Sequence, residues 1–187
     1  MDKKRLLVVV DMQKDFINGS LGTSEAKNIV EKVVDKIQQY QAEGDYIVYT
    51  MDTHNEEYME TQEGKNLPVS HCIYPQAGWQ LDDQIGEAIK GADGIAGRDV
   101  EYKKGTFGSW DLGEAVKSWE QHIESIELVG VCTGICVISN AVIIKAAVPE
   151  IPLMVDASCC ACVTPDTHNT ALEAMKLLQI KVKGEDL

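Results

Sequence analysis

The chain has 187 residues, of which 44% are hydrophobic and 25% charged, and this ordinary globular composition excludes a disordered or fibrous protein. The length favours a single domain spanning residues 1–187. A formal net charge of −13 would repel phosphate backbones and anionic lipid surfaces, so we expect neither nucleic acid nor a membrane as a partner.

The hydrophobic pattern and the cysteines indicate the cellular compartment. The longest apolar run near the N-terminus, residues 6–10, is too short for the core of a signal peptide or for a transmembrane helix. The six cysteines lie in apolar segments of a chain much larger than a disulfide-rich miniprotein. We therefore expect a cytoplasmic protein with free thiols.

The predicted elements alternate between strands and helices. The first strand is the apolar run 6–10, which has no polar alternation and ends at Asp11, as is typical of a strand buried on both faces. A helix follows, with Ser24 as its N-cap and Gly44 at its end. The other expected elements are strand 46–50, helix 81–89, strand 100–102, helix 112–119, strand 126–131, helix 135–147, strand 152–155, helix 165–178 and strand 180–182. This order predicts an α/β fold with a doubly wound, mostly parallel sheet and helices on both faces.

One connection in this pattern is unusually long. Residues 53–78 show no clear periodicity, and a connection of this length inside a compact domain is usually functional. Ligands of open parallel sheets bind beyond the carboxyl ends of the strands. We expect Asp11, Asp52, the pair Lys103 and Lys104, and the turn 131–136 to meet at that edge.

Cys136 is the candidate nucleophile. It follows the fourth expected strand in the segment Gly-Val-Cys-Thr-Gly-Ile-Cys-Val, at or near the N-terminus of a helix. The helix dipole and free amide groups would stabilise a thiolate there and lower the thiol pKa, and the same amides can bind an oxyanion. The alternative is a buried structural thiol, because free cysteines are among the most buried residues.

Asp11 and Lys104 would complete a catalytic set with Cys136. An unpaired carboxylate directly after five apolar residues is costly to bury, so Asp11 is expected to face a site or a cation. The alternatives are a turn or capping role for Asp11 and a solvated surface position for Lys104. Together the three residues would supply a base, a charge-stabilising cation and a nucleophile.

The long connection carries candidate metal ligands. Asp52 and His54 form an Asp-x-His pair whose side chains point to one face of an extended segment, and Glu60, Glu63 and His71 follow. Two imidazoles with one or two carboxylates suit Zn, Fe or Mn. The spacing is not a zinc-finger pattern, and the alternative is a polar surface loop with scattered histidines.

Three blocks of the sequence resemble the catalytic blocks of the isochorismatase-like cysteine hydrolases, and among these the nicotinamidases (pyrazinamidases). They are Val-Val-Val-Asp-Met-Gln-Lys-Asp-Phe ending at Phe16, Lys-Gly-Thr-Phe-Gly-Ser-Trp starting at Lys104, and the segment around Cys136, in the family's order. The resemblance covers essentially the whole chain and implies the family's three-layer α/β sandwich.

The resemblance implies specific roles for the residues of these blocks. Asp11, Lys104 and Cys136 would be the catalytic triad. The peptide bond between Val131 and Cys132 would be cis, and the backbone amides of Cys132 and Cys136 would form the oxyanion hole.

The family pattern also decides between the two neighbouring lysines. Because neighbours in an extended segment point to opposite faces, only one of Lys103 and Lys104 can reach the site. The family's lysine lies six residues before the aromatic residue that closes its block, here Trp110, and this selects Lys104.

Nicotinamidases carry a metal bound by an Asp-x-His pair and a later histidine. By this resemblance Asp52, His54 and His71 bind one divalent ion, for which Zn is the first choice and Fe or Mn the alternatives. Glu63 would be the fourth ligand, with Glu60 as the alternative.

The implied reaction is hydrolysis of a small amide, nicotinamide in the first place, through a thioester on Cys136. Phe16 with Phe107 or Trp110 would stack on the substrate ring, and a homo-oligomer is expected. Two positions depart from the family pattern: Thr133-Gly134 replaces the usual Thr-Asp, and the segment 67–70 lacks an aromatic residue that often precedes the last histidine.

Three other functions compete with this hypothesis. A metal-free relative acting on isochorismate, a carbamoyl compound or another small amide would bind no metal at Asp52, His54 and His71. A phosphoacceptor receiver module would leave both histidines and Cys136 without a role. An inactive binding protein on the same fold is the third alternative, because fold does not fix function.

Overall fold

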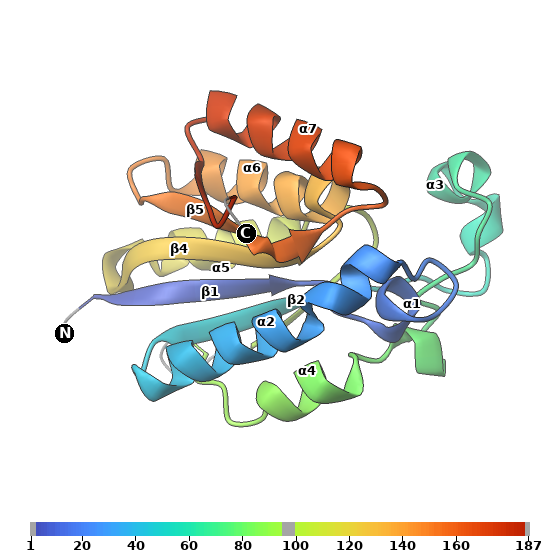
Figure 1. The fold of residues 1–187 in the computed structure, drawn as a ribbon, viewed down its shortest axis with the longest axis horizontal. Coiled ribbons are helices and arrows are strands. Elements are labelled where there is room, and N and C mark those ends of the chain that lie inside the picture. The colour runs from blue at the N-terminus through green and yellow to red at the C-terminus, as the bar shows by residue number, and fades with distance from the viewer. Residues whose placement is uncertain (1–2, 95–99, 186–187) are drawn as a thin grey trace.

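In the computed structural model, which describes residues 3–94 and 100–185, six parallel strands form one sheet in the order β3-β2-β1-β4-β5-β6 (Figure 1). The strands are β1 (Lys4–Val10), β2 (Tyr46–Asp52), β3 (Glu101–Lys104), β4 (Ile123–Val131), β5 (Leu153–Ala161) and β6 (Lys181–Lys183). The strand order reverses between β1 and β4, which is the place where doubly wound sheets bind ligands. The predicted fold class is confirmed.

Helices cover both faces of the sheet (Figure 1). One face packs against α2 (Ser24–Ala42) and α4 (Asp83–Ala88). The other packs against α5 (Trp110–Ser118), α6 (Ile138–Ala147) and α7 (Pro165–Leu177). Short helical turns complete the described chain: α1 (Lys14–Ile17), η1 (Tyr58–Glu60), α3 (Gln62–Asn66), η2 (Ala77–Trp79), η4 (Glu120–His122) and the π-helical turn η5 (Thr133–Val137).

The core consists of two apolar layers, one on each face of the sheet. In β1 the side chains of Leu6, Val8 and Val10 enter one layer, and those of Leu7 and Val9 enter the other. All five are fully buried, which explains why this strand shows no polar alternation. Burying each of these side chains contributes about 1.5–3 kcal/mol, so the central strand is firmly held.

Several element boundaries differ from the sequence prediction. Thr23 rather than Ser24 caps α2, since its hydroxyl accepts a hydrogen bond from the amide of Ala26. Strand β3 includes both Lys103 and Lys104, which were expected to follow it. Strand β5 continues well beyond residue 155 to Ala161: Asp156 pairs with β6, and after a register shift Cys160 and Ala161 pair again with β4.

The long connection after β2 is folded rather than irregular. It contains η1, α3 and η2, and a parallel bridge joins His54 to Ile73. The expected helix 135–147 divides into η5 and α6. In the described ranges, 3–94 and 100–185, no helix is long and apolar enough to cross a membrane.

Candidate active site

Asp11 occupies the switch point of the sheet, directly after β1. Its backbone adopts a left-handed conformation with φ of 48°, so the chain turns sharply out of the strand. The carboxylate is fully buried, and the hydroxyl of Thr50 donates a hydrogen bond of 2.6 Å to its Oδ1. The structure therefore places Asp11 at the carboxyl edge of the sheet, as its position after the apolar run predicts.

Lys104 joins Asp11 to Cys136. Its Nζ lies 2.7 Å from Asp11 Oδ2 and 3.7 Å from Cys136 Sγ, and it donates a hydrogen bond of 3.0 Å to the carbonyl of Thr106. All three side chains of the set are buried. The structure thus brings the predicted base, cation and nucleophile into direct contact.

Lys103 points away from this set. Its Nζ lies over the rings of Tyr74 and Trp79, at 4.9 Å and 5.1 Å from the ring centroids. The alternation of side chains along β3 explains this difference between neighbours. Of these two lysines, Lys104 is the one that lies against Asp11 and Cys136.

Cys136 lies within η5, at the start of the chain segment that continues as α6. The side chain of Asn140 donates a hydrogen bond of 2.8 Å to the carbonyl of Cys136 and accepts one of 3.0 Å from the amide of Ser109. Asn140 is completely buried. It fixes the turn against the segment before α5, a role that its sequence position inside a helix does not indicate.

The backbone before η5 approaches β1 closely. The peptide bond between Val131 and Cys132 is cis, as the resemblance implies. Gly130 has φ of +118°, and a Cβ at this position would lie 2.2 Å from the carbonyl oxygen of Val10. Only glycine fits here, so the approach of β4 to β1 beside Asp11 depends on it.

Burial raises the pKa of the Cys136 thiol well above its ordinary value, and the negative charge of Asp11 adds to this effect while Lys104 opposes it. The predicted lowering of this pKa is therefore wrong, because the residue is only 6% exposed. Burial also raises the pKa of Asp11, although Lys104 works against it. Asp11 is close enough to Cys136 to raise the pKa of the thiol, so a proton acceptor lies beside the nucleophile.

Four of the five candidate metal ligands meet beside this set. Asp52 Oδ2 lies 3.0 Å from His54 Nε2 and 3.3 Å from His71 Nε2, and Glu63 Oε1 lies 3.6 Å from His54 Nε2. The four ligand atoms lie within 4.8 Å of one another. Glu60 is exposed on η1 and is not part of the cluster, which favours Glu63.

The donor set fits a divalent transition metal. His71 Nδ1 lies 2.8 Å from the carbonyl of Val69, to which it donates when Nε2 is the unprotonated nitrogen. Hydrogen bonds from His54 and His71, helped by Lys104, hold the pKa of Asp52 well below its usual range despite burial, which by itself raises it. An ionised carboxylate with two imidazoles is a ligand set that Zn, Fe and Mn accept.

Asp52 connects the metal cluster with the catalytic set. Its Oδ1 lies 3.4 Å from Lys104 Nζ. The buried side chain of Gln13 accepts a hydrogen bond of 2.7 Å from the amide of Asp52 and donates one of 2.8 Å to its carbonyl. Gln13 follows Asp11 in the first sequence block, but nothing in the sequence alone indicated that it positions the end of β2.

The predicted ring-stacking residues separate into two groups. Phe16 lies beside His71, with ring centroids 5.5 Å apart. Phe107 and Trp110 are 43% and 70% exposed and line surface grooves along α5 and α6, so the structure does not place their side chains with the catalytic set. Buried Tyr58 contacts both histidine rings, and the sequence analysis missed it.

The fold and this site define an α/β protein with a buried Asp-Lys-Cys set at the switch point. A family model for the isochorismatase domain matches residues 5–183, so the chain belongs to the isochorismatase family. It is 26% identical to the nicotinamidase of Saccharomyces cerevisiae, an alignment that covers 95% of this chain and 98% of the yeast protein. It is 29% identical to the uncharacterized isochorismatase family protein PncA of Bacillus subtilis, over 74% of this chain and 77% of that protein.

Solved structures share the same fold. The nicotinamidase PncA from Bacillus subtilis superimposes with a TM-score of 0.81 at 24% identity, over 96% of this chain and 98% of that one. The pyrazinamidase of Pyrococcus horikoshii, solved in complex with zinc, has a TM-score of 0.77 at 24% identity, with the same two coverages. At this level of identity the likeness establishes the architecture, and the function must be argued from the site.

Proposed function

We propose that this protein is a nicotinamidase, which hydrolyses nicotinamide to nicotinate and ammonia through a thioester on Cys136. The observation that carries this proposal is the direct contact of Lys104 with Asp11, Cys136 and Asp52, which joins a nucleophile and its base to a metal-ligand cluster. Membership in the isochorismatase family and the nicotinamidase among its relatives support an amidohydrolase.

The first step transfers a proton and forms a covalent bond. Asp11 takes the proton of the Cys136 thiol, both groups lying against Lys104 Nζ, and the sulfur attacks the carboxamide carbon. The carbonyl electrons move to oxygen. The backbone amides of Cys132 and Cys136 would stabilise this oxyanion in the tetrahedral intermediate.

The second half of the reaction releases both products. Asp11 donates its proton to the leaving nitrogen, the carbon–nitrogen bond breaks and ammonia departs. A water molecule then gives a proton to Asp11 and attacks the thioester, and the carbon–sulfur bond breaks to return Cys136. Throughout, the positive charge of Lys104 stabilises the negative charge that alternates between Asp11 and the sulfur.

Asp52, His54, Glu63 and His71 would hold one divalent metal ion, with Zn as our first choice. When bound, such an ion offers a coordination site for the pyridine nitrogen of the substrate. Phe16, packed beside His71, provides an apolar ring next to that position. These residues would orient the carboxamide toward Cys136, and correct orientation is a large part of catalysis.

The test is ammonia release from nicotinamide by metal-loaded protein, compared with protein treated with a chelator. We expect turnover that falls at least ~10-fold on chelation and returns when Zn is added back. Benzamide, which lacks the ring nitrogen, should be a much poorer substrate. Metal-loaded protein that releases no ammonia from nicotinamide would refute the proposal, whereas metal-independent hydrolysis would favour the metal-free relative.

A further inference from the structure

A second pair of cysteines lies directly behind the catalytic turn. Val131 pairs with Ala161 at the carboxyl ends of β4 and β5, and Cys132 and Cys162 are the next residue of each segment. Neighbouring strands lie about 4.8 Å apart, which falls inside the Cα separation of about 4.4–6.8 Å that a disulfide spans. Cys162 Sγ lies 3.5 Å from the position that a Cβ on Gly134 would take, so this sulfur faces the turn that Cys132 precedes. In agreement, Cys162 is the largest cause of the raised pKa of Cys132.

Cys162 has an environment unlike that of its neighbours in β5. The hydrogen bond from Cys132, with further ones from the Thr167 hydroxyl and two backbone amides, lowers the pKa of Cys162 to about 5. Burial instead raises the pKa of Cys159 to about 11 and that of Cys160 well above its ordinary value. A thiolate is the reactive form of cysteine, so Cys162 is the reactive thiol of this strand.

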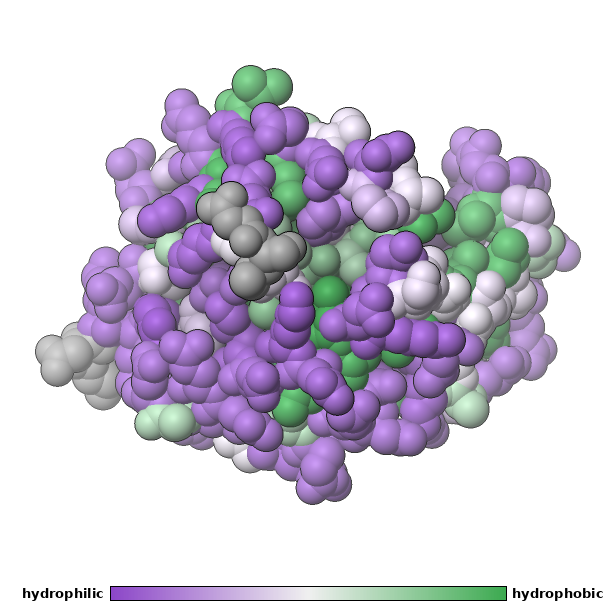
Figure 2. Space-filling model, viewed as in Figure 1, coloured by the Kyte–Doolittle hydropathy of each residue, from purple (hydrophilic) through white to green (hydrophobic). Residues whose placement is uncertain are grey.

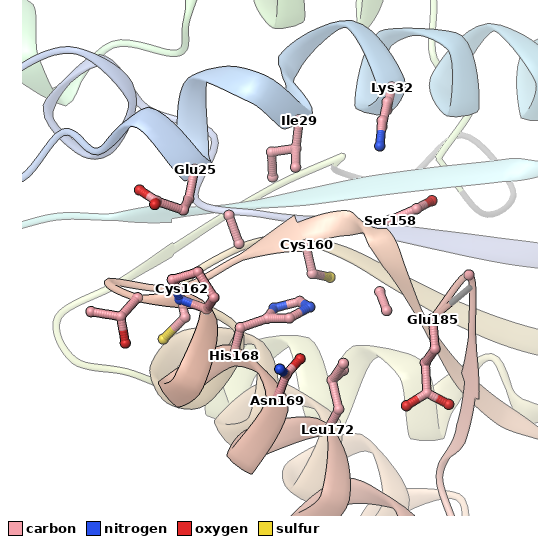
Figure 3. Close-up of a pocket in the computed structure, with 15 residues that line it drawn as sticks. Glu25, Ile29, Lys32, Ser158, Cys160, Cys162, His168, Asn169, Leu172 and Glu185 are labelled. Carbon is pink, nitrogen blue, oxygen red and sulfur yellow. The ribbon is translucent and has the colours of Figure 1, made fainter. Parts of the chain in front are cut away.

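A surface cavity leads to this thiol. Cys162 and His168 line a cavity of about 370 Å³ between α2, β5 and α7 (Figure 3). Apolar residues are visible between the polar surfaces of α2 and α7, which face the viewer as in Figure 1 (Figure 2). The cavity adjoins the back of η5, because His168 Nδ1 lies 2.8 Å from the hydroxyl of Thr133. Cys162 is itself only 4% exposed, so an oxidant must enter this cavity to reach it, by a route separate from the site of Asp11 and Lys104.

We propose that Cys132 and Cys162 form a redox-reactive pair that hydrogen peroxide converts into a disulfide. The Cys162 thiolate attacks peroxide, a sulfur–oxygen bond forms, the oxygen–oxygen bond breaks, and the departing hydroxide is protonated to water. Cys132 then loses its proton and attacks the sulfenic acid sulfur, and the second oxygen leaves as water. In total, two thiols are oxidised by two electrons and one peroxide is reduced to two waters.

This bond would couple the oxidation state to catalysis. Cys132 precedes η5, and the mechanism proposed above assigns its amide to the oxyanion hole, so this consequence rests on the proposed function. A cross-link to the end of β5 would restrain that amide. It would also convert the Cys162 thiolate, which accepts a hydrogen bond from the amide of Gly134 in the turn, into a weaker acceptor. We expect the oxidised protein to turn over its substrate more slowly than the reduced one.

The covalent step is tested in the Cys136→Ala protein, so that oxidation of the nucleophile does not interfere. After peroxide treatment, peptide mapping without reductant should recover one linked pair containing Cys132 and Cys162, and dithiothreitol should separate it. Adding Cys162→Ala should abolish the link, whereas Cys159→Ala should leave it. In a Cys132→Ser background, dimedone should label Cys162 as a trapped sulfenic acid. Oxidation spread evenly over the cysteines, with no such link, would overturn the proposal.

The regulatory consequence has its own measurement. Enzyme with native Cys136 and its Cys162→Ala variant are exposed to peroxide together, and each residual activity is normalised to its own untreated sample. Both proteins lose activity through oxidation of Cys136. Any greater loss of activity in the unsubstituted enzyme than in Cys162→Ala therefore measures the effect of the cross-link. We expect at least a fivefold excess that dithiothreitol reverses. Equal losses would overturn the coupling to catalysis, while the peptide map separately decides whether the bond forms.

Discussion

Two buried charge clusters lie on the same sheet, and they differ in how their charges are compensated. Near the middle of β4, Glu127 accepts a hydrogen bond of 2.6 Å from the Tyr40 hydroxyl and lies 3.2 Å from Lys36 Nζ and 3.4 Å from Lys183 Nζ. Lys36 also pairs with Asp156 at 2.7 Å. Each carboxylate of this cluster has a nearby ammonium and a hydrogen-bond donor, as a structural ion-pair network requires.

The catalytic cluster has fewer cations for its acidic groups. Asp11 and Asp52 share the single ammonium of Lys104, and the Cys136 thiol lies against the same group. Burial raises the pKa of both Asp11 and Cys136, so it opposes ionisation of either group. The comparison teaches that one network compensates each of its buried charges, whereas the other holds groups with perturbed pKa values, the pattern typical of functional sites.

The largest effect should follow from removing the nucleophile. We expect Cys136→Ala to lower nicotinamide turnover at least ~1000-fold with little change in thermal stability, because the lost side chain is small and the mechanism needs its sulfur. Ammonia release and a melting curve measure the two quantities. Cys159→Ala is the control and should keep most of the activity. Retained turnover in Cys136→Ala would end the covalent mechanism.

The next effect should distinguish the two lysines of β3. Lys104→Ala should reduce turnover ~100-fold or more, because Asp11 and the sulfur lose their stabilising cation. Lys103→Ala should stay near the unsubstituted rate, since its ammonium lies over Tyr74 and Trp79. Side-by-side rates decide the matter, and the reverse ranking would show that the proposed assignment is off by one residue.

Metal content should depend on the histidines of the cluster and on no other histidine tested. We expect elemental analysis of purified protein to find about one Zn, Fe or Mn per chain, and His54→Ala to lose most of it. His122→Ala, in η4 outside the cluster, is the matched control and should retain the metal. Protein never exposed to chelator that carries no metal would contradict the assignment of these four ligands.

Substitutions in the cluster around Glu127 should change the stability of the protein and leave its turnover unchanged. Tyr40→Phe removes a buried hydrogen bond to Glu127 and should lower the free energy of unfolding by about 1.5–3 kcal/mol. Tyr49→Phe, whose hydroxyl bonds the half-buried Glu101, should cost less. Urea titration gives both values. A fall in turnover of Tyr40→Phe equal to that of Lys104→Ala would mean that the two clusters are not independent.

The smallest effect is a pH dependence of that same stability. Burial alone would raise the pKa of Asp156, but hydrogen bonds from Lys36 and Ser158 lower it below its ordinary value. Its contribution is therefore complete above the unfolded pKa of about 4 and is lost as pH falls through the folded value. Asp156→Asn should be less stable at neutral pH, and the difference should shrink in acid. A constant difference in urea midpoint from pH 7 to pH 3 would contradict this linkage.

The failures of sequence reasoning have local physical causes. The second half of β5 was missed because its residues are small or polar, and it is the pairing with β6 at Asp156 and with β4 at Cys160 and Ala161 that holds them in a strand. The single turns α1 and α3 are too short to show helical periodicity. The pKa of Cys136 was predicted in the wrong direction because a helix-terminus argument assumes access to solvent, and the turn is buried.

The sequence by itself determined the order of strands and helices, and with it the convergence of Asp11, Lys104 and Cys136, because parallel strands deliver their carboxyl ends to one edge of a sheet. Only the tertiary structure decided that Glu63 and not Glu60 joins the cluster of candidate metal ligands. It also decided that buried Gln13 and Asn140 position the site, and that burial opposes ionisation of the thiol. These properties depend on distances and solvent exclusion between segments far apart in the chain, which no local pattern of residues records.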